Sequence, residues 1–223
     1  MITSHHNPLL KDIRRLQRRR DGRFVAEGED LLAAADAAGW DALARLRAGV
    51  DVQPEVLAKV SSLGSGTREL GVFAERWAPA PLGPLCVHLH GVGDPGNVGA
   101  VLRSAHAFGA ASVVLGPGCA DPFGPKAVRA SMGAVFTVPL ARGGVEDLPG
   151  ETIALVAGEG EPLADLAAAA SVSVVVGAER AGLPPEVVAA CDRVAHIPIR
   201  GDSLNAAMAA TIGLYQLAGR LAG

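Results

Sequence analysis

The sequence predicts an α/β fold with a mainly parallel sheet and helices on both faces of that sheet. From residue 85 onward, short apolar and β-branched runs alternate with helix-like segments, which is the pattern of parallel sheets. About half of the 223 residues are hydrophobic (49%), enough for a sizeable core, and Ala, Val and Leu must fill it because aromatic residues make up only 4%. Glycine-rich turns follow several predicted strands, at the sheet edge where ligands bind in such folds.

The elements follow from periodicity and from helix-breaking residues. The predicted strands are 24–26, 85–90, 112–115, 134–138, 152–157, 172–177 and 194–197. The predicted helices are 8–20, 29–38, 97–108, 126–132, 163–169, 185–190 and 203–221. Residues 46–77 show a mixed pattern that assigns no element. Three prolines and one glycine in residues 78–84 predict a semi-rigid linker between domains at 1–77 and 85–223.

Composition narrows the class of protein. No apolar stretch has signal-peptide length at the start, and none approaches the roughly 18 residues of a membrane span, so we expect a cytoplasmic protein without membrane contact. Cys86, Cys119 and Cys191 form no CxxC pair. We therefore expect buried free thiols, and neither a disulfide framework nor a metal site.

Basic residues concentrate at the N-terminus although the net charge is −3. Residues 1–25 contain seven Lys or Arg against two Asp. Helical spacing gathers four of them on one face, opposite Leu9, Ile13 and Leu16: Lys11, Arg14, Arg15 and Arg18. This basic stripe predicts contact with RNA phosphates, and an ordinary solvated face is the alternative.

One glycine pattern is misleading. Gly91, Gly93 and Gly96 spell GxGxxG between a strand and a helix, as in dinucleotide-binding folds. The acidic residue expected after the next strand is missing, since Leu115 is followed by 116–118, Gly-Pro-Gly. Pro95 also removes a backbone N–H from the turn that would bind pyrophosphate. These departures argue against a dehydrogenase.

Three motifs carry polar side chains to strand ends. The first, residues 94–109, places Asn97 in the first turn of a helix and Arg103 one turn after Gly99. Gly99 either clears space for the Arg103 guanidinium or permits close helix–sheet packing. The second, residues 174–185, runs from a buried strand into a glycine turn with Glu179 at its mouth. In the third, residues 196–208, Ser203 opens the last helix, and Ser203 or Asn205 could cap it.

Together the three motifs resemble the SpoU (TrmH-like) family of RNA 2′-O-ribose methyltransferases, in the SPOUT superfamily. The resemblance covers residues 85 to about 220 in order and spacing, including the intervening segment 121–133. The segment with Asn7, Pro8 and 24–28 is similar to the small RNA substrate-binding domain of some members. Departures from the family pattern are Ala178, Arg180 and the Ala206–Ala207 pair.

The resemblance implies a C-terminal trefoil knot, a homodimer that uses the last helix, and S-adenosyl-L-methionine as the cofactor. It implies cofactor binding by Gly177, Ile197, Pro198 and Leu204, largely through backbone groups. Arg103 is implied as the base or as the group that orients the hydroxyl; positioning is physically easier, because a guanidinium stays protonated.

Asn97, Glu179, Ser203 and Asn205 would hold Arg103 and the ribose in place, and in a dimer Arg103 would act on the partner's cofactor site. The expected substrate is ribosomal RNA, with transfer RNA as the alternative. Methylation of a base, and an RNA-binding protein without catalysis, are the weaker alternatives.

Overall fold

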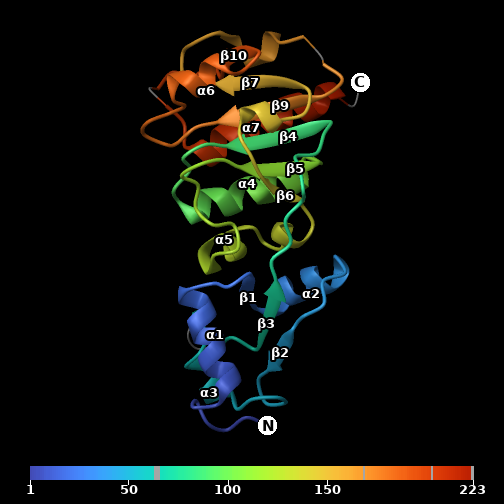
Figure 1. Cartoon of the computed structure of the whole chain (residues 1–223), viewed down its shortest axis with the longest axis vertical. Helices are drawn as coiled ribbons and strands as arrows, with labels where there is room; N and C mark the ends of the chain where they lie inside the picture. The colour runs from blue at the N-terminus through green and yellow to red at the C-terminus, as the bar shows by residue number, and fades with distance from the viewer. Residues whose placement is uncertain (63–65, 168, 202, 222–223) are drawn as a thin grey trace.

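The computed structural model describes residues 1–62, 66–167, 169–201 and 203–221, and these form an elongated molecule with a small N-terminal unit at one end (Figure 1). In this small unit β3 lies between β1 and β2 and is antiparallel to both. Its elements are α1 (Pro8–Arg18), β1 (Arg23–Glu27), α2 (Glu29–Ala37), β2 (Ala44–Arg47), α3 (Pro54–Ala58) and β3 (Glu69–Ala74).

Helix α1 begins where the sequence signals predict. The Asn7 side chain accepts a hydrogen bond from the Leu9 amide at 2.9 Å, and Pro8 occupies the first turn, where its missing N–H costs nothing. Leu10, Ile13 and Leu16 are the fully buried residues of the helix, so Leu10 rather than Leu9 completes its apolar face.

The larger unit is built on a parallel sheet whose described strands have the order β6-β5-β4-β9-β7-β10-β8. The α/β class predicted from the sequence is confirmed. The strands are β4 (Leu85–Leu89), β5 (Ser112–Leu115), β6 (Leu140–Arg142), β7 (Glu151–Leu155), β8 (Glu161–Pro162), β9 (Val172–Val176) and β10 (Arg193–His196). The helices are α4 (Pro95–Ala107), α5 (Pro125–Ala130), α6 (Pro185–Ala189) and α7 (Ala206–Leu221), with single 3-10 turns at Ala134–Phe136, Val145–Asp147 and Leu163–Asp165.

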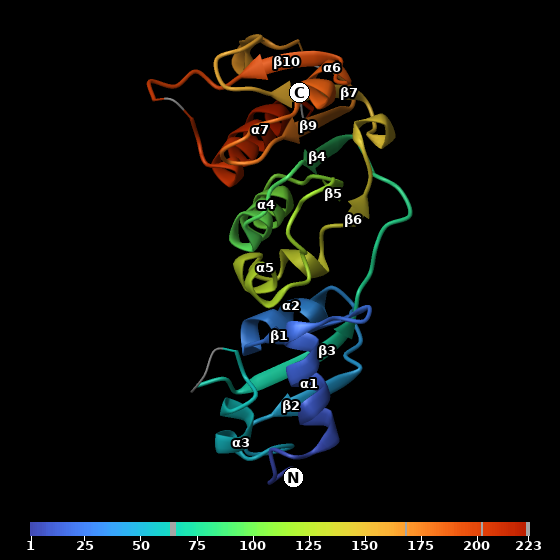
Figure 2. The ribbon, with the colours of Figure 1, turned by 60° about the vertical axis from the view of Figure 1, so that its left-hand side comes forward.

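Helices α4 and α7 pack against each other on one face of this sheet (Figure 2). The Ser104 and Thr211 hydroxyls lie 2.6 Å apart between them. On the opposite face, a small cluster of Cys86, Val114 and Ala141 is covered by chain segments, through Ala78 of the linker and Leu148. Cys86 is fully buried, whereas Cys119 and Cys191 are partly exposed, and all three thiols are free.

Three predicted elements were wrong in type or extent. The predicted strand 134–138 begins instead with a buried 3-10 turn at Ala134–Phe136, and the strand follows at Leu140–Arg142. A short apolar run looks the same in either structure. The predicted helix 163–169 is a 3-10 turn over Leu163–Asp165, and its residue 168 lies outside the described residues. The last helix begins at Ala206, so Ser203 does not open it.

Aromatic side chains join the two units. Phe24, Trp40 and Phe73 of the N-terminal unit meet Phe123 and Phe136 of the larger one, with 4.8 Å between the Phe24 and Phe123 ring centroids. The Trp40 indole donates a hydrogen bond to the Phe136 carbonyl at 2.8 Å. We call this junction the aromatic seam; it makes one continuous core of both units. The domain boundary at 78–84 and the trefoil knot stay predictions.

Candidate active site

A cavity of about 380 Å³ opens at the carboxyl ends of β7, β9 and β10. Three loops form its wall, the ones that follow these strands, and the start of α7 closes it. Of the predicted cofactor residues, Gly177, Ile197 and Leu204 line it. Pro198 lines an adjoining cavity of about 340 Å³ that shares Ala157, Ile197 and Ile199 with the first. Glu179 and Ser203 line the first cavity as well.

The loop after β9 folds tightly on itself. The Ala178 amide donates to the Gly182 carbonyl at 3.1 Å, and the Gly182 amide donates back at 2.9 Å. A Cβ atom on Gly177 would lie 2.3 Å from the Gly182 carbonyl carbon, so only glycine fits at position 177. This closed loop forms one wall of the cavity, and Glu179 is one of its lining residues.

Hydrogen bonds join the three sequence motifs at this mouth. The Asn97 side-chain amide donates to the Glu179 carboxylate. The Asn205 amide donates to the Asn97 Oδ1 atom at 3.1 Å. The residues are 82 and 108 positions apart in sequence, so this Asn205–Asn97–Glu179 chain forms only when α4, the loop after β9 and the start of α7 are assembled.

Helix caps fix the two asparagines. The Asp94 carboxylate accepts from the Gly96 amide at 2.7 Å and from the Asn97 amide at 3.1 Å, which caps α4. Asn205 Oδ1 accepts from the Ala207 and Met208 amides at 2.9 and 3.3 Å, so Asn205, not Ser203, caps α7. Asn205 therefore caps α7 and also bonds to another predicted site residue, Asn97.

Arg103 is not a member of this hydrogen-bonded chain in the described structure. Arg103 is exposed on α4, and within the described residues no hydrogen bond or ion pair is recorded for it. Asn97, Glu179 and Asn205 therefore do not hold Arg103 within this single chain. Its neighbour Ser104 contacts α7, so Arg103 lies beside the α4–α7 contact.

Gly99 does not clear space for Arg103. A Cβ atom on Gly99 would lie 2.4 Å from the Ala127 carbonyl oxygen and 2.6 Å from the Ala130 Cβ. The glycine thus lets α4 pack closely against α5. This is a packing explanation, although the partner is a helix and not the sheet.

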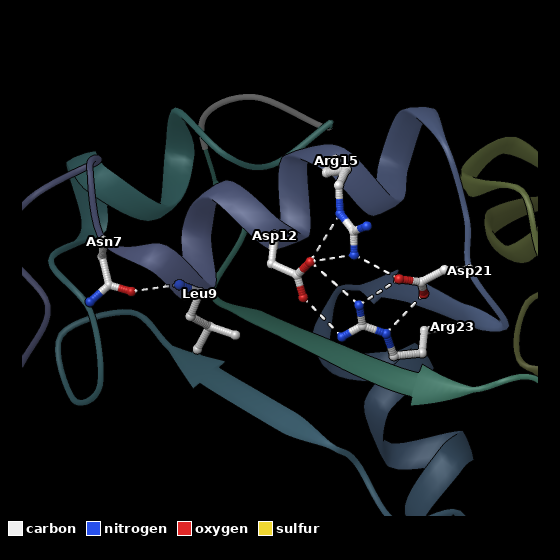
Figure 3. A network of polar contacts seen from close by, with 6 residues as sticks. All are labelled: Asn7, Leu9, Asp12, Arg15, Asp21 and Arg23. Carbon is white, nitrogen blue, oxygen red and sulfur yellow. Dashed lines mark hydrogen bonds and ion pairs between the residues drawn. The ribbon is translucent and has the colours of Figure 1, made fainter.

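The predicted basic stripe is only partly free (Figure 3). The Arg15 guanidinium bonds the carboxylates of Asp12 and Asp21 at 2.7 and 2.6 Å, and Arg23 bonds the same two carboxylates. These arginines lower the pKa of both carboxyl groups and keep them ionised. Lys11 and Arg18 are exposed, and in the part of the chain that the structure describes neither has a recorded acidic partner.

The sequence did not single out several cavity residues. Leu155, Val156, Ala157 and Glu159 come from the end of β7 and its following turn, and Ile199 follows β10. The glycine turn after Ala157 was the available signal for the first group.

Across the described residues, no set of three His, Cys, Asp or Glu side chains is placed to hold a metal ion. No helix within those residues is long and apolar enough to cross a membrane.

Comparison of the sequence with known protein families identifies the family of this chain. The sequence model of the SpoU rRNA Methylase family matches residues 84–215, which is more than half of the chain. The chain belongs to the SpoU rRNA methylase family. The match spans β4 to α7 and thus all three motifs, and leaves the N-terminal unit outside.

Individual SpoU relatives are similar over different lengths. The 23S rRNA (guanosine(2553)-2′-O)-methyltransferase RlmP of Bacillus subtilis strain 168 is 35% identical over 57% of this chain and 55% of its own length. This chain therefore spans about half of that relative. The AdoMet-bound rRNA methyltransferase from Sinorhizobium meliloti is 31% identical over 99% of this chain and 97% of that one, with a TM-score of 0.89. The SpoU methyltransferase AviRb from Streptomyces viridochromogenes, in complex with AdoMet, is 25% identical over 96% and 98%, with a TM-score of 0.84.

Proposed function

We propose that this protein transfers a methyl group from S-adenosyl-L-methionine to a ribose 2′-hydroxyl of RNA, with ribosomal RNA as the substrate. The observation that carries the proposal is the Asn205–Asn97–Glu179 chain at the mouth of the 380 Å³ cavity, in a member of the SpoU family. The RNA modification by RlmP and the cofactor bound to two solved relatives support the choice of substrate and donor.

The cavity suits a nucleoside-like cofactor. Its size falls within the range of small-molecule sites, and its walls combine backbone groups with apolar side chains such as Leu155, Ile197 and Leu204. Gly177, Ile197, Pro198 and Leu204 would hold the cofactor, which supplies an activated methyl group when bound. The glycine at 177 lets the loop backbone come close to a ligand, as backbone recognition requires.

Side chains of this protein would position the ribose hydroxyl for the transfer. A ribose hydroxyl is a weak acid, and it must be aligned with the methyl group and lose its proton. The Asn205–Asn97–Glu179 chain, with Ser203 beside it, would position the ribose at the cavity mouth. Arg103 would orient the hydroxyl and stabilise its developing negative charge, because its guanidinium stays protonated.

A homodimer would complete this site. Met208, Ile212 and Tyr215 follow one stripe of α7 and are 60%, 38% and 65% exposed, an apolar surface that a second copy would cover. Arg103 lies beside this helix and has no recorded partner in the described part of its own chain. A partner's α7 on this stripe would bring Arg103 near the partner's cavity. We place this homodimer in the cytoplasm, without membrane contact or a bound metal.

Transfer of labelled methyl groups tests the central proposal. Purified protein, labelled S-adenosyl-L-methionine and unmodified ribosomal or transfer RNA are incubated, and the modified position is then mapped. We expect label on one nuclease-resistant ribose of ribosomal RNA. Label on transfer RNA would change the substrate, and label on a base, or on no RNA, would refute the chemistry.

Arg103→Ala separates chemistry from cofactor binding. We expect turnover to fall at least about 100-fold, because the group that stabilises the developing charge is lost, while cofactor affinity changes less than a few-fold. Arg45→Ala, which removes an exposed arginine of β2, is the matched control and should retain activity. Calorimetric titration with the cofactor checks the first variant, and a large loss of affinity would make Arg103 a structural residue.

A further inference from the structure

Lys126 of α5 connects the segment 121–133 to the mouth of the cavity. Its ammonium group bonds the Oδ2 atom of Asp94 at 2.7 Å. The other oxygen of that carboxylate, Oδ1, caps α4 by accepting from the Gly96 and Asn97 amides. Both oxygens of Asp94 are therefore occupied, which fixes the rotation of the carboxylate and, with it, the first turn of α4 that carries Asn97.

Close packing of the two helices sets the position of Lys126. Gly99 lets α4 approach the Ala127 carbonyl of α5, and Lys126 is the neighbouring residue. The Lys126 side chain then lies across the first turn of α4, where a Cβ atom on Gly96 would be 3.3 Å from its Cε atom. A side chain at position 96 would compete for this space.

Stability of the helix or of the fold does not account for this lysine. Lys126 lies in the first turn of α5, where the helix dipole disfavours a cation. The ion pair is exposed, with 58% of the Lys126 side chain and 46% of the Asp94 side chain accessible to solvent, and such pairs contribute little to folding. Among the groups around Asp94, Lys126 lowers the pKa of its carboxyl group most, which keeps the capping charge in place.

We propose that Lys126 is a positioning residue for methyl transfer, which acts through Asp94 on Asn97. Asn97 is the central member of the hydrogen-bonded chain, since its amide nitrogen donates to Glu179 and its oxygen accepts from Asn205 at 3.1 Å. A small rotation of the first turn of α4 would weaken both hydrogen bonds, and a misplacement of about 1 Å can cost roughly 100-fold in rate. The proposal rests on the proposed function, because it takes this chain as the site of the ribose.

Steady-state kinetics with a rescue variant test this role. For Lys126→Met, we expect kcat to fall roughly tenfold or more, while the KM for RNA and the cofactor affinity change less than about twofold. Lys126→Arg, which keeps a cation within reach of Asp94, should recover most of the rate. Lys59→Met is the matched control with wild-type rates, because it removes the same charge at the end of α3, far from α4 and α5 in Figure 1. A raised KM for RNA with unchanged kcat would identify Lys126 as a direct RNA contact and overturn the proposal.

Non-additivity shows whether Lys126 acts through Asn97. Asn97→Ala alone should lower the rate, and we expect Lys126→Met to cause no further loss in that variant, because the group it positions is already gone. Full additivity of the two losses would mean that the lysine acts elsewhere, and would refute the proposal.

A spectroscopic signal tests the positioning role without relying on activity. The Asn97 side-chain amide gives a nitrogen–proton NMR signal, which the Asn97→Ala spectrum identifies by its loss. We expect this signal to shift in Lys126→Met and to return to its wild-type position in Lys126→Arg, while the thermal midpoint stays close to that of the wild type. An unmoved signal would refute the positioning role. If the wild type methylates no RNA, the proposed function fails, and the amide signal still decides whether Lys126 positions Asn97.

Discussion

At the scale of single residues, Asn205 uses its two side-chain atoms for different tasks. Its Oδ1 atom caps α7, and its Nδ2 atom donates to Asn97. An amide can do both because it carries an acceptor and a donor, whereas an ionised aspartate, which only accepts, supplies the cap alone. The cap fixes where the donor points, so the start of the last helix also sets the geometry at the cavity mouth.

Asn205→Asp and Asn205→Ala separate these two tasks. The carboxylate keeps the cap but cannot donate to Asn97, so we expect nearly unchanged thermal stability and a large loss of methyl transfer. Alanine loses the cap as well, which costs about 1 kcal/mol of folding free energy. Thermal unfolding and single-turnover assays measure the two effects. Full activity in Asn205→Asp would show that the donated hydrogen bond is dispensable.

His88 gives the protein a pH-dependent stability. Burial lowers its pKa to about 4, and its Nδ1 atom is buried without a recorded partner in the described structure. The unfolded chain, with an ordinary histidine pKa near 6.5, binds the extra proton first. Stability therefore falls as the pH drops from about 6.5 to 4, at most by roughly 1.4 kcal/mol per pH unit. Denaturant unfolding should show a shallower decline for His88→Gln, and parallel curves would rule out the histidine as the cause.

At the scale of elements, the contact between α4 and α5 depends on one glycine. Gly99→Ala would press a methyl group against the Ala127 carbonyl and Ala130, so we expect a loss of about 1–3 kcal/mol. Gly219→Ala in α7 is the matched control, because a Cβ atom there meets nothing within 4 Å. Its higher helix propensity should leave stability equal or slightly increased. Chemical denaturation compares the two, and a neutral Gly99→Ala would show that α5 can move away.

Most elements near the site could be predicted because their sequence signals are local. Pro8, Pro95 and Pro185 each stand at the start of an observed helix, and the run 112–115 is a strand as predicted. The 3-10 turn at Ala134–Phe136 was missed because its burial comes from Trp40 and Phe24, which no local pattern reveals. The role of Gly99 could not be predicted for the same reason, because it depends on contact with Ala127 and Ala130 of α5.

The candidate site could also be predicted only in part. Asn97, Glu179 and Asn205 could be named from their motifs, but only the fold shows that they bond to one another. The neutralisation of Arg15 likewise needed the tertiary structure, since Asp21 and Arg23 reach it from beyond the end of α1. Spacing along a helix predicts which charged residues share a face, but it does not predict which charged groups from other segments lie close to them.

At the scale of the whole molecule, the aromatic seam makes the two units one body. Six of the eight aromatic Phe, Trp and Tyr residues lie at this junction, although such residues are scarce in the chain: Phe24, Trp40, Phe73, Trp77, Phe123 and Phe136. The Arg20–Asp121 ion pair adds a charged contact between the units. A rigid junction would hold the N-terminal unit at a fixed separation from the cavity.

Trp40→Phe tests this coupling. The variant keeps an aromatic ring but loses the hydrogen bond to the buried Phe136 carbonyl, which costs about 1–3 kcal/mol. Because the core is continuous, we expect one cooperative transition at a lower temperature by calorimetry. Arg47→Gln, in the same unit but away from the junction, should melt like the wild type. Two separate transitions in the wild type would show that the units unfold independently.

The hydrogen bond between Asn205 and Asn97 also bears on how the protein is made. Translation proceeds from the N-terminus, so the N-terminal unit, β4 and α4 leave the ribosome well before α7. Until α7 is synthesised, Asn97 lacks its second partner, and the cavity lacks the wall that Leu204 and Ala206 provide. We therefore expect a nascent chain arrested before residue 205 to fold much of its sheet without binding the cofactor, so that cofactor binding would report completion of the last helix.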